Sequence, residues 1–354
     1  MVDISIGGAG WAGTVHALAA AATGRVRVRA VASRDPEHAG NVASVVNADV
    51  LTFAELPVGK ELVIVATPPV HHHELARKAI DAGNPVLIEK PLCSTLEEAD
   101  DLIAAVTAAG TVAGYAENLL FAPIIELARA RILALGPLRH LELRCAQPPP
   151  DWGHFIEPLT DGGVLHDLGA HPLALALAFT SPVEPVSVTA TLSSTRLDDA
   201  DDLAEVTLTF PPAAGAGNGS TAALTAHIEC SWLATEPSWT IQAASDTGTV
   251  VVELLPQLRL EHNGVEVELP PLRDDLADLR LEEFGYINQL NGILDVTLGR
   301  GGNLCPLGFA REVLSVTSAA YASAGADGEP VALPWTGRRD LTPLQLWRGV
   351  DDAD

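Results

Sequence analysis

The first 117 residues alternate two hydrophobic patterns. Short runs rich in Val and Ile are separated by longer Ala- and Leu-rich stretches whose apolar residues recur with a helical period. This alternation is typical of β-α units around a parallel sheet. It predicts strands at 2–7, 26–32, 48–52, 61–66, 85–89 and 111–115, and helices at 11–23, 36–46, 70–83 and 95–109.

Residues at the ends of these segments support the predicted helices. Asp35 can act as an N-cap before Pro36, and Ser94 or Thr95 precedes two glutamates in a first turn. Glycines fall where three of the helices should stop, at 24, 83 and 110.

After residue 117 the pattern changes. We expect a helix at 121–135, a strand at 138–146, a helix at 163–179, alternating strands between 183 and 268, and helices at 273–298 and 306–324. The predicted fold class is α/β, with a first domain at 1–118 and a C-terminal α+β domain at 119–354. The second domain is expected to contain an open, mostly antiparallel sheet of about five to six strands, and the late helices may pack back on the first domain.

Composition narrows the class of protein. The chain has 354 residues, of which 47% are hydrophobic, which is enough for two cores. Its net charge of −25 argues against nucleic acid and anionic membranes as partners, because both require a basic surface. An acidic cluster precedes the alternating segment 204–210 and is interpreted as a solvated loop without the spacing of a calcium site; it comprises Asp198, Asp199, Asp201 and Asp202.

Cysteines and apolar segments indicate the compartment. The four cysteines, at 93, 145, 230 and 305, lack CxxC spacing, so free thiols in a reducing compartment are expected. The N-terminus enters a strand without an export signal, and the apolar stretch 102–116 is too short to span a bilayer. We therefore expect a cytoplasmic protein.

A GxGxxG run connects the first predicted strand to the first helix. It reads Gly8-Ala9-Gly10-Trp11-Ala12-Gly13, in the context in which this motif binds a dinucleotide. Two glycines let the backbone approach a pyrophosphate, the third lets the helix pack on the strand, and the helix N-terminus offers N–H groups. The first domain is thus predicted to be a Rossmann domain; a merely flexible turn is the alternative.

The end of the second strand bears on the choice of nucleotide. An NAD site usually carries Asp or Glu there, whereas this chain has Ser33 and Arg34, which suit a 2′-phosphate and favour NADP. Asp35 lies nearby, but its role as a helix cap accounts for it. His38, one turn further on, could add a cofactor contact.

Two further segments should line the cofactor cleft. Thr67 and Pro68 follow a buried strand, and among three consecutive histidines His72 is the one expected to face the cleft. Glu89-Lys90-Pro91 closes another buried strand at the edge where open α/β sheets bind ligands. Lysine occurs only at 60, 78 and 90, and its ammonium can donate to a substrate oxygen. A strand-end lysine facing water is the alternative.

Asp167 and His171 form a second candidate pair. They are four residues apart, so on one helix they share a face, and the carboxylate could orient the imidazole as a general base. A hydrogen bond without a catalytic role is the alternative. A zinc site that adds His154 or His166 is disfavoured, because the HExxH arrangement is absent.

Taken together, these motifs make the chain resemble the Gfo/Idh/MocA oxidoreductases, a family that includes sugar and inositol dehydrogenases and sugar ketoreductases. The resemblance covers nearly the whole chain. Its segments are Gly8 to Gly13, Thr67-Pro68 through His72, Glu89-Lys90-Pro91, and Gly162 to His171.

The resemblance implies roles for individual residues. Lys90, Asp167 and His171 would form the catalytic set, and Glu89 and Lys90 would lie beside the nicotinamide ribose. Two departures leave the substrate open: Ala174 stands where many members have Asp, and no arginine follows Asn118. Candidate substrate contacts are Asn118, Trp152 and His154.

The sequence therefore predicts an NADP(H)-dependent oxidoreductase, with NAD(H) possible, that moves a hydride between nicotinamide and a secondary alcohol or ketone of a sugar-like or cyclitol substrate. Two alternatives stay open: an NAD-dependent glycosidase of the same fold, and a non-catalytic nucleotide-binding protein. No metal is expected. A homodimer or homotetramer is predicted, because an exposed antiparallel sheet face often pairs with a copy of itself.

Overall fold

The computed structural model describes residues 1–150, 162–212, 223–273 and 280–349. The chain divides into two compact units. Unit 1 comprises Met1–Ala122 and Leu272–Arg311, and unit 2 comprises Pro123–Pro271 and Glu312–Asp354. A late segment of the chain thus belongs to the first unit, whereas the sequence places it in the second domain with its helices packing back.

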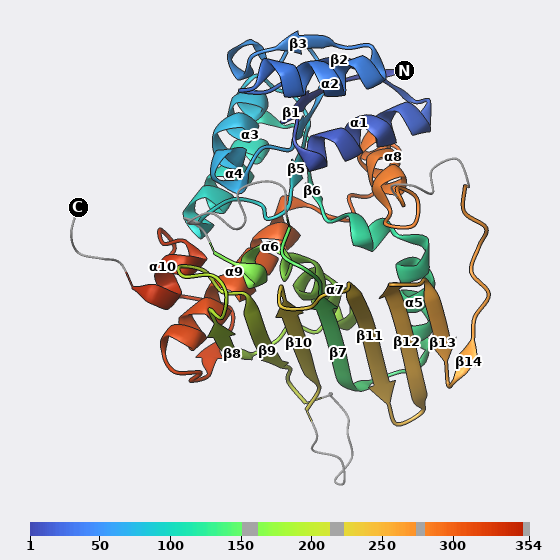
Figure 1. Ribbon diagram of the computed structural model, residues 1–354, viewed down its shortest axis with the longest axis vertical. Coiled ribbons are helices and arrows are strands. Elements are labelled where there is room, and N and C mark those ends of the chain that lie inside the picture. The colour runs from blue at the N-terminus through green and yellow to red at the C-terminus, as the bar shows by residue number, and fades with distance from the viewer. Residues whose placement is uncertain (151–161, 213–222, 274–279, 350–354) are drawn as a thin grey trace. The chain divides into compact units, whose positions relative to one another are not determined.

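Unit 1 contains a parallel sheet of six strands (Figure 1). Their order is β3-β2-β1-β4-β5-β6, the order of the Rossmann fold, and each neighbouring pair is parallel. The strands are β1 (Val2–Gly7), β2 (Val26–Ala32), β3 (Asp49–Leu51), β4 (Leu62–Val65), β5 (Val86–Glu89) and β6 (Ala113–Ala116). Every residue of β4 and β5 is buried, which explains their continuous apolar sequences. The predicted fold is confirmed here.

The helices of unit 1 begin and end within two residues of the predicted positions, except that the predicted helix at 273–298 begins only at Tyr286, because residues 280–285 form turns and Gly285 has a φ of 80°. They are α1 (Trp11–Thr23), α2 (Pro36–Val46), α3 (His72–Asp81), α4 (Leu96–Ala109) and α8 (Tyr286–Thr297), with the 3-10 turns η1 (Phe53–Glu55), η2 (Pro69–His71) and η3 (Asn118–Phe121). The predicted caps are confirmed. The Asp35 carboxylate accepts two N–H groups at the start of α2, and Thr95 and Glu98 form a reciprocal capping box on α4.

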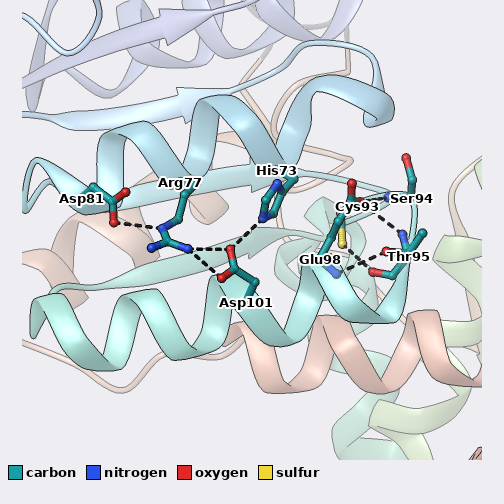
Figure 2. A network of polar contacts seen from close by, with 8 residues as sticks. All are labelled: His73, Arg77, Asp81, Cys93, Ser94, Thr95, Glu98 and Asp101. Carbon is teal, nitrogen blue, oxygen red and sulfur yellow. Dashed lines mark hydrogen bonds and ion pairs between the residues drawn. The ribbon is translucent and has the colours of Figure 1, made fainter. Parts of the chain in front are cut away.

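A polar network joins the outer faces of α3 and α4 (Figure 2). The Arg77 guanidinium donates to both oxygens of Asp101, at 2.6 and 2.7 Å, and to Asp81 at 2.9 Å. The His73 ring lies 2.8 Å from Asp101 on the other side. The hydrogen bond from Arg77 is the main reason that the pKa of Asp101 lies below its usual value. The network ties two helices of the same sheet face together.

The late helix α8 completes the core of unit 1. One cluster of buried side chains joins Ile4 and Ile6 of β1, Val15 of α1, and Leu290 and Leu294 of α8. Helix α8 packs against α1, so residues nearly three hundred positions apart close a single core. Most of the stabilisation of this unit comes from such burial, which contributes about 1.5–3 kcal/mol for each large aliphatic side chain.

Unit 2 contains a sheet of nine strands in the order β14-β13-β12-β11-β7-β10-β9-β8-β15 (Figure 1). The strands are β7 (Leu138–Ala146), β8 (Ser187–Ser193), β9 (Leu203–Thr209), β10 (Thr225–Ser231), β11 (Ser238–Ser245), β12 (Gly248–Leu255), β13 (Arg259–His262), β14 (Val265–Glu266) and β15 (Val331–Ala332). Among the described strand pairs of this second sheet, only β7–β10 is parallel. The predicted mostly antiparallel sheet is confirmed, but it has nine strands rather than the predicted five to six. Short edge strands such as β14 and β15 carry too few residues to show an alternating pattern.

Unit 2 also contains helices, some of which pack against this sheet. They are α5 (Pro123–Ala134), α6 (Val164–Asp167), α7 (Ala170–Thr180), α9 (Leu307–Gly325, within unit 2 from residue 312) and α10 (Pro343–Arg348). Helix α5 packs against β12 and β13, and α7 against β7 and β10. Among the described residues, no helix is long and apolar enough to cross a membrane.

The predicted single helix at 163–179 is wrong, because the structure has α6 and α7 there with a break between them. At the break the Gly169 N–H donates to the Val164 carbonyl, five residues back, at 2.9 Å. A Cβ at position 169 would lie 2.3 Å from the Leu165 carbonyl oxygen, so the backbone of this widened turn accepts only glycine. Apolar residues on both sides of the break conceal it in the sequence pattern.

Candidate functional site

The glycine loop of unit 1 brings β1, α1 and the end of β4 into close contact. Gly8 has a φ of 120°, and a Cβ added there would lie 2.1 Å from the Ala66 carbonyl oxygen. A Cβ at Gly13 would lie 2.1 Å from the Gly8 carbonyl oxygen. Both positions therefore require glycine, and the N-terminus of α1 is held against the carboxyl end of the sheet.

The middle glycine differs from its neighbours. Gly10 is the N-cap of α1, with no side-chain cap, and a Cβ added there would meet nothing within 4 Å. Ala12 is half-buried, and the exposed Trp11 ring lies edge-on to Tyr286 at 6.2 Å. The helix start thus offers N–H groups with open space beside them, the arrangement that binds phosphate groups. These residues fit a dinucleotide.

The end of β2 presents a cation beside a carboxylate. Ser33 is half-buried and Arg34 is exposed. The backbone N–H groups of His38 and Glu37 hold the pKa of Asp35 below its usual value, so Asp35 stays ionised as the cap of α2. The exposed His38 ring lies 3.6 Å from Asp35. Arg34 is available to an anionic ligand, whereas Asp35 already serves the helix.

His72 lies inside unit 1. The ring is fully buried, with Nε2 2.6 Å from the Thr67 carbonyl oxygen and Nδ1 2.9 Å from that of Pro91. Burial lowers its pKa. The ring nitrogens face carbonyl oxygens rather than an open surface, so the imidazole connects the segment Thr67 and half-buried Pro68 to the segment after Lys90. As a direct cofactor contact, His72 stays a prediction.

Glu89 and Lys90 are supported by a residue that the sequence analysis missed. Glu89 Oε1 lies 2.7 Å from Nε2 of His16 on α1, and Oε2 accepts the Lys90 backbone N–H at 3.1 Å. Burial raises the pKa of Glu89, but the His16 hydrogen bond and the charges of His16 and Lys90 outweigh it and lower the pKa overall. His16 lies three residues after the third glycine, on the face of α1 that packs on the sheet. This position is the only feature of the sequence that could have indicated its role.

Asp167 and His171 of unit 2 lie in one buried segment but on two helices. Asp167 is the last residue of α6, and its N–H donates to the Gly163 carbonyl at 3.0 Å. His171 is the second residue of α7, and its ring lies 5.7 Å from that of Trp239 on β11. The pair therefore flanks the break at Gly169.

The interpretation of the acidic cluster as a solvated loop is wrong for two of its members. Asp198 and Asp199 are exposed, but Asp201 and Asp202 are 0% and 1% exposed. The Asp202 carboxylate accepts backbone N–H groups of residues 195–197. Both buried carboxylates are stabilised by backbone donors, which the linear sequence does not show.

Of the three predicted substrate residues, one lies within the described ranges. Asn118 is buried, and its Nδ2 donates to the Phe284 carbonyl at 2.8 Å. Trp152 and His154 lie outside the described residues. Within the described ranges, no group of three or more His, Cys, Asp or Glu side chains could hold a metal ion.

Two family profiles match the chain. The profile described as "Oxidoreductase family, NAD-binding Rossmann fold" matches residues 2–116, and the one described as "GFO/IDH/MocA C-terminal domain" matches residues 128–251. Together they cover more than half of the chain. The chain belongs to the Gfo/Idh/MocA family.

The names of several Gfo/Idh/MocA relatives describe enzymes that act on sugars. The chain is similar to dTDP-3,4-didehydro-2,6-dideoxy-alpha-D-glucose 3-reductase of Streptomyces antibioticus, with 31% identity over 44% of this chain and 50% of that protein. It is 28% identical to UDP-N-acetylglucosamine 3-dehydrogenase of Acidithiobacillus ferrooxidans, over 77% of this chain and 81% of that one.

A solved structure supports the fold over nearly the whole chain. GenD2 from gentamicin A biosynthesis, in complex with NAD, has 25% identity and a TM-score of 0.81, covering 94% of this chain and 97% of that one. Against several curated relatives the chain spans only about half of their length, for example 53% and 50%.

Proposed function

We propose that this protein is an NADP(H)-dependent oxidoreductase that transfers a hydride between nicotinamide and a secondary alcohol or ketone of a sugar-like or cyclitol substrate. The observation that carries the proposal is the open N-terminus of α1, where Gly10 leaves space beside the first turn of the helix. The names of two relatives, a sugar 3-reductase and a sugar 3-dehydrogenase, support the substrate class.

The residues that would hold the cofactor come from unit 1. The first turn of α1 would bind the pyrophosphate, with Gly8 and Gly13 keeping the loop close to the sheet. Ser33 and Arg34 would bind a 2′-phosphate, because a hydroxyl and a guanidinium both donate to it. When bound, the nicotinamide ring accepts or supplies the hydride.

Three side chains would handle the proton and the charge. In the oxidation direction His171 takes the proton of the substrate hydroxyl, and Asp167 orients that imidazole. The Lys90 ammonium stabilises the developing alkoxide, and the reduction direction reverses these roles. Glu89 contributes indirectly, since its carboxylate holds the Lys90 backbone N–H and is itself held by His16.

Substitution at Gly10 tests nucleotide binding without disturbing the fold. In Gly10→Ala the new methyl group contacts no protein atom, so the protein should fold normally, but it occupies the space that a pyrophosphate needs. We expect at least a tenfold rise in the Kd for NADP+, measured by calorimetry. Gly40→Ala is the matched control, because a Cβ there also meets nothing within 4 Å and Gly40 lies inside α2. Equal affinity in both variants would contradict the proposed site.

A substrate panel tests the reaction. D-glucose, D-xylose, myo-inositol and UDP-N-acetylglucosamine are each incubated with NADP+ or NAD+, and reduction is followed by nicotinamide absorbance. Turnover of at least one compound supports the proposal. Nucleotide binding without turnover would favour a binding protein, and release of sugar from a glycoside without added nucleotide would favour a glycosidase.

A further inference from the structure

A buried polar cluster in unit 2 lies outside the roles assigned above. It joins Asp201, just before β9, to Tyr321 on α9, and both side chains are 0% exposed. The Tyr321 hydroxyl donates to Asp201 Oδ1 at 2.6 Å. Burial raises the pKa of both groups, and the carboxylate also raises that of the phenol, so Tyr321 keeps its proton and remains a donor.

The cluster accepts four consecutive N–H groups at the start of α6. Asp201 accepts those of Gly163 at 2.9 Å and Leu165 at 2.8 Å through its carboxylate, and that of Val164 at 2.8 Å through its carbonyl. The Tyr321 oxygen accepts from His166 at 3.2 Å and also from Gly163 at 3.1 Å. The first N–H groups of a helix have no partner within it, so two distant residues here do the work of a cap.

The glycines before α6 are required by the same cluster. A Cβ at Gly163 would lie 2.0 Å from the Asp201 carbonyl oxygen. A Cβ at Gly162 would lie 2.6 Å from His166 Cβ and 2.8 Å from the Tyr321 hydroxyl oxygen. Two adjacent positions are thus closed to any side chain, because the backbone of this segment lies directly against Asp201 and Tyr321.

We propose that Asp201 and Tyr321 are positioning residues for the proposed reaction. They hold the start of α6, a helix of four residues that ends at Asp167. They thereby set the position of Asp167 and that of the adjoining helix α7, which carries His171. So short a helix has little stability of its own, and its orientation depends on the groups that hold its ends. Neither positioning residue is assigned a contact with substrate or cofactor. The inference rests on the proposed function.

Tyr321→Phe removes one hydroxyl and keeps the buried ring. It leaves the His166 N–H without its acceptor and takes one donor from Asp201. Ser323→Ala is the matched control: it removes a buried hydroxyl from the same helix, which donates to the Glu329 carbonyl and accepts the Ala190 N–H. Both variants lose hydrogen bonds of α9, but only the first loses those of α6.

The variants are compared in amide hydrogen exchange, NADP+ affinity and steady-state kinetics with the panel compound that the wild type oxidises fastest. For Tyr321→Phe we expect at least tenfold faster exchange at residues 163–166, at least a tenfold lower kcat with a changed pH profile, and a Kd for NADP+ within twofold of wild type. Ser323→Ala should show none of these changes. Unchanged exchange at 163–166, or a kcat and pH profile equal to those of Ser323→Ala, would overturn the inference.

Failure of the proposed function is distinguishable from failure of this inference. If the wild type turns over no panel compound, the NMR signals of the His171 ring decide: a shift in Tyr321→Phe that is absent in Ser323→Ala supports the positioning role, and unchanged signals reject it. If Tyr321→Phe does not fold, Asp201→Asn takes its place in the same measurements, with the same expected and contradicting results. The amide keeps the shape of the side chain but removes its charge.

Discussion

Replacement of His16 by alanine should strongly destabilise unit 1. His16 Nε2 lies 2.7 Å from the Glu89 carboxylate, and the two side chains are 0% and 10% exposed. Removing the partner of a buried ionised carboxylate leaves that charge uncompensated and typically costs about 3–5 kcal/mol. We expect His16→Ala to lower the free energy of unfolding of unit 1 by an amount in this range at neutral pH.

The loss should depend on pH in a defined direction. In the wild type the pKa of Glu89 is lower in the folded protein than in the unfolded chain. The contact with His16 therefore stabilises the fold fully at pH values above the unfolded-state pKa of Glu89. This stabilisation is lost as the pH falls through the folded-state pKa of Glu89. Without His16, burial dominates and disfavours the ionised carboxylate. The difference between variant and wild type should therefore be largest near neutral pH and shrink toward pH of about 4.3, the ordinary carboxyl pKa.

Urea unfolding followed by hydrogen exchange of unit 1 peptides measures this difference, because the two units need not unfold together. The double variant His16→Ala with Glu89→Gln is the control, since it removes the charge that His16 compensates. The stability of the double variant should depend less on pH than that of His16→Ala alone. The double-mutant cycle then isolates the coupling energy between His16 and Glu89. A loss below about 1 kcal/mol, the range of exposed pairs, or a loss independent of pH would refute a buried ionised Glu89.

Four other substitutions test separate parts of the molecule. Lys90→Ala or His171→Ala should cut turnover by orders of magnitude while calorimetry shows the Kd for NADP+ within a few-fold of wild type; unchanged turnover in both would reject their assignment. Arg34→Ala should weaken NADP+ binding roughly tenfold, the loss of one charge-assisted contact, and leave NAD+ binding unaffected in the same titration. Asp101→Asn should cost at most about 1 kcal/mol in urea unfolding, because the Asp101 and Arg77 side chains are each 40% exposed and solvent screens their charges. That cost should fall at high salt, and it should also fall as the pH drops below the lowered pKa of Asp101; a salt-independent loss would contradict this reading.

Local signals in the sequence predicted unit 1 well. The β4 and β5 runs, the cap at Asp35 and the capping box at Thr95 each depend on residues within a few positions of one another. Such signals are readable without a structure, and they were sufficient for the parallel sheet and its glycine loop.

Long-range contacts account for what the sequence did not predict. His16 meets Glu89 across 73 positions, and Tyr321 meets Asp201 across 120, so no local pattern joins them. The acidic run containing Asp201 appeared to be a solvated loop because its burial depends on backbone donors from another segment. The break at Gly169 was hidden because the residues on both of its sides are apolar.

The contribution of α8 to the core of unit 1 has a consequence during synthesis. A ribosome that has finished β6 must still translate strands β7 to β14 of unit 2 before Leu290 and Leu294 reach α1. At about 5–20 residues per second this wait is on the order of ten seconds or more. Throughout it, the apolar surface of α1 that α8 will cover stays uncovered on the nascent chain, where a chaperone could bind it.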